Sequence, residues 1–143
     1  INEISEISNP IERSNFIIHY YEDILNYISA NKISSGKSMV KKCMELVEQN
    51  ISNPSLSVKW LASQLYINEN YLSRVFHKEA GIFLIKYINN QRLIKAKYYL
   101  DHDYNSMQAV SQMTGFSDPL YFSKCFKKKY GVAPSKYIKM VDK

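Results

Sequence analysis

Two short stretches of the chain place polar and basic side chains at matching positions. They run from residue 68 to 78 and from residue 118 to 128, and they align with an offset of 50. Arginine, lysine, asparagine and serine are the side chains that hydrogen-bond to base edges or hold phosphates. The positions on the predicted outer face are Asn70, Ser73, Arg74 and His77 in the first stretch, and Leu120, Ser123, Lys124 and Lys127 in the second.

A simpler explanation is that two helix pairs resemble each other through duplication and have no role in binding. The second stretch speaks against it, because residues 119–130 contain no acidic side chain, whereas a solvated helix face usually mixes glutamate with lysine. The run from Lys127 to Lys129 remains open between a solvated face and a contact with a phosphate backbone.

Each stretch is the second half of a longer repeat. Ser57 and the apolar residues after it match Ser106 and its successors with an offset of 49, so one extra residue falls in the second turn. The serines are typical helix N-caps, as are Asn68 and Asp118 before the second helices, which stop at glycines. A short helix, a tight turn and a second helix make a helix-turn-helix unit. We predict two such units, at about residues 57–81 and 106–131.

The segment between the units, about residues 82–100, predicts one long linker helix. At ~1.5 Å per residue it is roughly 28 Å long, which compares with the ~34 Å repeat of DNA. It is apolar on two sides, so it can pack against a subdomain at each end. Arg92 lies within an apolar sector, and we expect it to form a structural ion pair or cap rather than to contact DNA.

The N-terminal part differs in character from the rest. Residues 1–36 carry a net charge of −3 and residues 37–143 one of +9, which favours an anionic partner for the latter. Phe16–Ile28 predicts a helix, and residues 31–38 predict a break. We interpret residues 1–36 as a linker and helical extension from a missing regulatory region. The Phe16–Ile28 helix either pairs with a second copy, giving a homodimer, or packs within its own chain.

Composition narrows the remaining choices. With 45% apolar residues, 4 glycines, 4 prolines and no strand alternation, the chain predicts an all-α fold of about seven helices plus the N-terminal extension. No segment resembles a membrane span or signal peptide, so we expect a cytoplasmic protein. Cys43 and Cys125 are interpreted as reduced core thiols, and Trp60 and Tyr66 as packing in the core or at its rim.

Catalytic and metal chemistry find no support in the sequence. There is no Gly-rich phosphate loop and no local serine–histidine–aspartate motif. His19, His77 and His102 lack metal-ligand spacing with one another or with a cysteine. We therefore predict no enzyme, no cofactor and no metal site.

Three motifs occur in an order that matches one known family. They are Tyr71-Leu72-Ser73-Arg74-Val75-Phe76, then Tyr87-Ile88 with Arg92-Leu93 and Ala96, and finally Gly115-Phe116-Ser117-Asp118-Pro119 with Tyr121-Phe122-Ser123-Lys124, Phe126-Lys127-Lys128, Gly131-Val132, Pro134 and Tyr137. Across residues 37–141 the chain resembles the DNA-binding domain of the AraC/XylS family of bacterial transcription regulators. It is most similar to the version at the C-terminus of some two-component response regulators.

The resemblance implies seven helices in residues 37–143 and major-groove binding through helices that start near Asn68 and Asp118. Lys124 replaces the family's usual arginine and lacks its bidentate fork, so we expect the first unit to dominate specificity. The apolar Pro119 and Leu120 suit thymine methyl groups better than hydrogen-bonded readout. Implied base contacts are Asn70, Ser73, Arg74, Pro119, Leu120, Ser123 and Lys124, and implied phosphate contacts are His77, Lys78, Lys127 and Lys128.

The sequence therefore predicts sequence-specific binding of double-stranded promoter DNA in transcriptional control, with RNA polymerase as a further partner, and it does not decide between an activator and a repressor. Two alternatives stay open. One is a protein-interaction module that keeps the helix-turn-helix fold, and the other is sequence-independent binding of nucleic acid or another polyanion.

Overall fold

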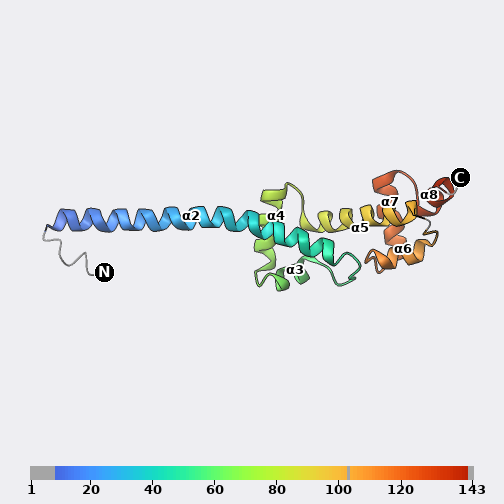
Figure 1. Ribbon diagram of the computed structural model, residues 1–143, viewed down its shortest axis with the longest axis horizontal. Helices are drawn as coiled ribbons and strands as arrows, with labels where there is room; N and C mark the ends of the chain where they lie inside the picture. The colour runs from blue at the N-terminus through green and yellow to red at the C-terminus, as the bar shows by residue number, and fades with distance from the viewer. Residues whose placement is uncertain (1–8, 103, 142–143) are drawn as a thin grey trace. The chain divides into compact units, whose positions relative to one another are not determined.

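The computed structural model describes residues 9–102 and 104–141, which form seven α-helices and no strand (Figure 1). The predicted all-α fold is confirmed. By its internal contacts the chain divides into two compact units, residues 1–38 and 39–143. The helices are α2 (Pro10–Gln49), α3 (Val58–Gln64), α4 (Glu69–Ala80), α5 (Leu84–Asp101), α6 (Met107–Met113), α7 (Pro119–Tyr130) and α8 (Pro134–Val141).

Helix α2 is longer than the sequence predicts. The expected break at residues 31–38 is wrong, because α2 continues through it without interruption. A single glycine such as Gly36 costs a helix only about 1 kcal/mol relative to alanine, and no proline follows Pro10 until after the helix ends. The predicted Phe16–Ile28 helix lies inside α2, whose first turn is capped by the Asn9 side chain accepting from the Ile11 amide at 2.9 Å.

Helices α3 and α4 form the first helix-turn-helix unit. The predicted caps are confirmed: the Ser57 hydroxyl accepts from the Trp60 amide at 3.1 Å, and the Asn68 side chain accepts from the Asn70 amide at 2.9 Å. Leu61 of α3 and Leu72 and Phe76 of α4 are completely buried. They pack in one core with the C-terminal part of α2, which fixes the angle at which α4 leaves the turn.

Helices α6 and α7 repeat this construction. Ser106 caps α6 through the Ala109 amide at 3.2 Å, and Asp118 caps α7 through the Leu120 amide at 2.9 Å, with Pro119 in the first turn. Phe122 and Phe126 of α7 are completely buried, as Leu72 and Phe76 are in α4. Both second helices, α4 and α7, end at the predicted glycines.

Helix α5 belongs to both cores, as predicted, but the expectation of two buried apolar sides is wrong, because Phe83, Ile94 and Tyr98 of the second side are exposed. Leu84 and Ile88 are buried in the first core, and Leu93, Ala96 and Leu100 are buried in the second. Its 18 residues make a rod of about 27 Å. Because one continuous helix contributes to both cores, the two helix-turn-helix units are held at a fixed separation.

Arg92, in the middle of α5, contacts residues that belong to the two helix-turn-helix subdomains on either side of it. It is only 8% exposed, and its terminal nitrogen donates to the carbonyl of Asn53 at 2.8 Å and to that of Leu56 at 3.4 Å. Its guanidinium also lies over the Phe116 ring, 5.8 Å from the centroid. The predicted structural role is confirmed, through carbonyl groups and an aromatic ring rather than an ion pair.

Helix α8 packs against the second core through Tyr137 and Ile138. The Tyr137 hydroxyl donates to the Asp101 carboxylate at 2.5 Å, and the Lys97 ammonium lies 2.7 Å from the other oxygen of that carboxylate. These two hydrogen bonds hold the pKa of Asp101 below its usual value. The network fastens α8 to the end of α5 and so supports the core under α7.

Candidate nucleic-acid interface

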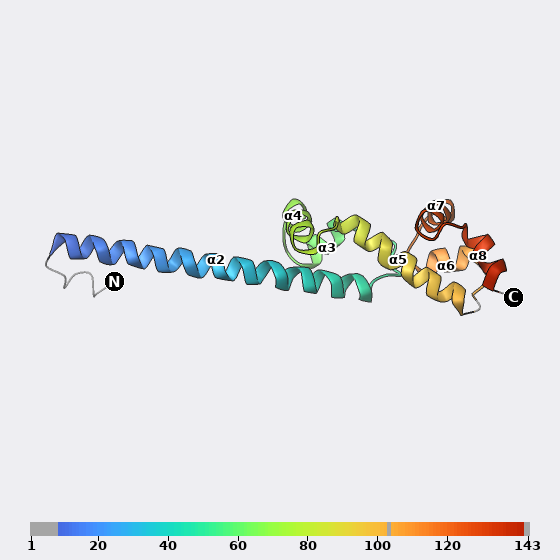
Figure 2. The same ribbon diagram turned by 90° about the horizontal axis from the view of Figure 1, so that it is seen from above.

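Helices α4 and α7 lie on the same side of α5. In Figure 1 α7 runs across α5 and α4 runs in the same direction at the N-terminal end of α5, and in Figure 2, turned by a quarter, both are seen nearly end on at a similar height. Their axes therefore run in similar directions, and α5 contacts each of them. Two helices presented in this way leave their outer faces available to the same extended partner.

The outer face of α4 carries the residues that the sequence singled out. Asn70, Arg74, His77 and Lys78 are exposed, and Ser73 is half-buried. The Arg74 guanidinium lies 6.0 Å from the centre of the Tyr71 ring, which restricts its otherwise long and mobile side chain. The structure thus brings all five predicted residues onto the free surface of one helix.

The His77 ring is held in place by a neighbour outside α4. It stacks on Phe83, with ring centres 4.3 Å apart and planes inclined by 13°. Phe83 caps the start of α5, so this stack anchors the last turn of α4 against the linker helix. His77 can still reach outward, because it remains exposed.

The outer face of α7 is cationic with an apolar start. Lys124, Lys127 and Lys128 are exposed, and within the described residues none of them lies in a salt bridge. Leu120 is 78% exposed, which is unusual for leucine and suits a residue that covers an apolar group on a partner. Pro119 and Ser123 are half-buried beside them.

The exposure of Tyr66 differs from the prediction made from the sequence. Tyr66, predicted to pack in the core or at its rim, is 95% exposed in the turn before α4. Its φ of 55° is left-handed, which costs a non-glycine residue about 1–2 kcal/mol. The offset of 49 already pairs it with Gly115, and both turns make the same backbone bond, Ile67 to Ala62 and Phe116 to Ser111. That pairing is the signal that could have found it.

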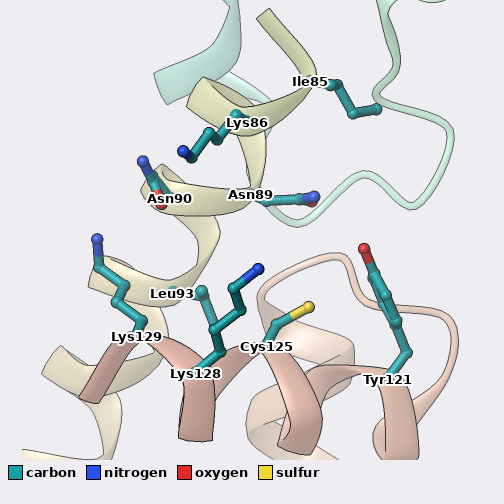
Figure 3. Close-up of a pocket in the computed structure, with 9 residues that line it drawn as sticks. All are labelled: Ile85, Lys86, Asn89, Asn90, Leu93, Tyr121, Cys125, Lys128 and Lys129. Carbon is teal, nitrogen blue, oxygen red and sulfur yellow. The ribbon is translucent and has the colours of Figure 1, made fainter. Parts of the chain in front are cut away.

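A pocket of about 610 Å³ separates α5 from α7 (Figure 3). Its polar lining consists of Lys86, Asn89 and Asn90 from α5, and Tyr121, Lys128 and Lys129 from α7. Tyr121, Asn89 and Cys125 line the pocket together, and the neighbouring Cys125 side chain is the main cause of the raised pKa of Tyr121. Cys125 is half-buried at the pocket wall, whereas Cys43 is completely buried, with a pKa raised to about 11 by that burial.

Over residues 9–102 and 104–141, no three histidine, cysteine, aspartate or glutamate side chains gather closely enough to hold a metal ion. None of the helices in that part of the chain is both long and apolar enough to cross a bilayer.

Known proteins share this arrangement. A family model described as a helix-turn-helix domain matches residues 61–140. The regulatory protein PocR of Salmonella typhimurium is 30% identical over 132 residues, which is 90% of this chain and 43% of PocR. The chain thus spans less than half the length of this relative.

Two solved structures show the same fold. The C-terminal domain of AraT, a response regulator from Geobacillus stearothermophilus, is 27% identical, with a TM-score of 0.68 over 71% of this chain and 84% of that domain. The DNA-binding domain of the transcription factor AdpA, solved with a target DNA, is 20% identical, with a TM-score of 0.66 over 71% of this chain and 90% of that domain. The chain belongs to the AraC/XylS family of transcription regulators and carries that family's helix-turn-helix DNA-binding domain.

Proposed function

We propose that residues 39–143 bind double-stranded DNA sequence-specifically to regulate transcription, with α4 and α7 entering successive major grooves. The observation that carries the proposal is the common side of α5 on which both helices lie, each with an exposed polar or cationic outer face. An α-helix fits the major groove, and successive grooves on one face of DNA are ~34 Å apart. A domain of the same fold was solved with its target DNA, which supports this use of the fold.

The two helices would recognise different base groups. On α4, Arg74 can bond to two guanine acceptors and Asn70 to two adenine groups, with Ser73 beside them. On α7, Pro119 and Leu120 suit thymine methyl groups, and Ser123 and Lys124 supply single hydrogen bonds. His77, Lys78, Lys127 and Lys128 would hold phosphates at the ends of both helices. We therefore expect α4 to contribute most of the discrimination.

Binding to a selected target duplex and to a scrambled duplex tests the proposal. A target would first be selected from random DNA, and both affinities would then be measured over a salt series. We expect the target to bind at least ~10³-fold more tightly at physiological salt. Equal affinities for both duplexes would show sequence-independent binding. No binding to either would favour a protein-interaction module that retains the fold.

We also propose that α2 pairs with a second copy of itself in the region of residues 11–28. Apolar side chains recur there every seven residues, as a coiled coil requires, and most are exposed. The pairs seven residues apart are Ile11 and Ile18, Ile18 and Leu25, Tyr20 and Tyr27, and Tyr21 and Ile28.

Sedimentation equilibrium of the full chain and of residues 37–143 decides the dimer proposal. We expect a dimer for the full chain and a monomer for the shorter one, because only the former has the heptad face. A monomeric mass for both the full chain and residues 37–143 would contradict the dimer proposal. At a promoter, such a dimer would place two DNA-binding domains on one site and regulate RNA polymerase there.

A further inference from the structure

The pocket between α5 and α7 gathers cations without any acidic neighbour in its lining. Lys86 comes from α5, and Lys128 and Lys129 come from α7, with the side-chain amides of Asn89 and Asn90 beside them. Figure 3 shows the α7 side chains extending toward α5 across the pocket. Three ammonium groups around one hollow repel one another, so an anion bound there would be favoured.

The width of this pocket is set by side chains that do not carry charge. Tyr121 lines it from α7 and Asn89 from α5, with Cys125 one turn further along α7. Leu93 forms the floor and is buried in the second core. Because Leu93 of α5 is buried in the same core as Phe122 and Phe126 of α7, the two helices are packed together and the cationic lining is organised before any ligand arrives.

The pocket also has a defined place between the two recognition helices. Its α5 residues, at positions 85, 86, 89, 90 and 93, follow a helical spacing of four and so form one stripe. That stripe faces α7, and α4 lies on the same side of α5 as α7 does (Figure 2). DNA that takes α4 and α7 in successive major grooves turns its minor groove, bordered by two phosphate backbones, toward this part of α5.

We propose that Lys86, Asn90, Lys128 and Lys129 bind a backbone phosphate of the DNA between the two major grooves, which makes the linker helix a third contact with DNA. The inference rests on the proposed function, because only DNA held by both helices brings a phosphate to this position. The ammonium groups supply the charge, and the amide of Asn90 supplies a directional hydrogen-bond donor. The contact carries no sequence information, so it strengthens binding to all duplexes that occupy both helices.

Salt dependence measures this contact directly. Each neutralised phosphate contributes a slope of about −0.9 to the plot of log affinity against log salt concentration. Lys86→Gln should therefore reduce the magnitude of the slope by about 0.9 on the target duplex. Lys95→Gln is the matched control, because Lys95 is exposed on the same helix but lines a different hollow with Glu48 and Tyr98. This control should keep the wild-type slope.

A neutral methylphosphonate placed at the phosphates midway between the half-sites completes the test. It should weaken the wild type and the Lys95→Gln variant by the same factor and Lys86→Gln by a smaller factor, since part of the contact with this phosphate is already lost in Lys86→Gln. The inference is overturned if Lys86→Gln keeps the wild-type slope, or if the methylphosphonate weakens it as much as the wild type. A failure of the proposed function is recognised separately, because the wild type would then show no preference for the target over scrambled DNA.

Discussion

Replacing Gly115 by alanine is expected to lower the free energy of unfolding by about 3 kcal/mol. Gly115 has a φ of +78°, and a left-handed conformation costs a residue with a Cβ about 1–2 kcal/mol. The added Cβ would also overlap the carbonyl oxygen of Ile51 and lie 3.0 Å from the Arg92 guanidinium. Overpacking of this kind costs about 1–3 kcal/mol more, because neither a backbone oxygen nor a buried arginine can move away freely.

Gly81→Ala and Gly131→Ala are the controls for this prediction, measured in the same urea titrations. Both glycines have a left-handed φ, at +71° and +81°, but a Cβ on either meets nothing within 4 Å. They should lose only the backbone part, about 1–2 kcal/mol. If Gly115→Ala loses no more than the controls, the close approach of the second turn to Ile51 and Arg92 does not contribute to stability.

Replacing Arg74 by alanine is expected to weaken binding to the selected target by about 1–3 kcal/mol, which is a factor of roughly 5 to 150 in Kd. Arg74 is the one arginine on the outer faces of α4 and α7, and only arginine offers a rigid fork that matches two acceptors of guanine. The loss should be confined to one base position, where the variant accepts other bases. A panel of single-base variants of the target, bound by wild type and variant, measures it.

Lys78→Ala separates this effect from a general loss of charge. Lys78 is exposed one turn further along α4 than Arg74. It lies in the last turn of the helix, where we expect contacts with phosphates. Its removal should weaken all duplexes of the panel by the same factor and change no base preference. The assignment of base readout to Arg74 is wrong if the Arg74→Ala profile across the panel is as uniform as that of Lys78→Ala.

Most of the fold follows from local chemistry that a sequence displays. Ser57, Asn68, Ser106 and Asp118 are short polar residues placed before apolar runs, and each caps a helix as predicted. The prediction that α5 joins both cores is also confirmed, but its second apolar side is not buried, because Phe83, Ile94 and Tyr98 are exposed. The outer-face residues of α4 and α7 follow from the same helical spacing and are indeed on the surface.

What the sequence could not give depends on contacts between distant residues or on marginal energies. Whether Gly36 interrupts α2 is a matter of about 1 kcal/mol, which the composition of residues 31–38 does not decide. The hydrogen bonds of Arg92 join residues 36 and 39 positions apart, and the pocket exists only where α5 and α7 meet. No local sequence pattern predicts contacts between residues so far apart in the chain.

Methylation protection of guanine N7 on the selected target shows whether α4 and α7 occupy successive major grooves, because N7 lies in the major groove. We expect two clusters of protected guanines about 10 base pairs apart on one face of the duplex, one removed by changing Asn70 and Arg74 and the other by changing Leu120 and Lys124. A single cluster, or two clusters half a turn apart, would contradict this expectation.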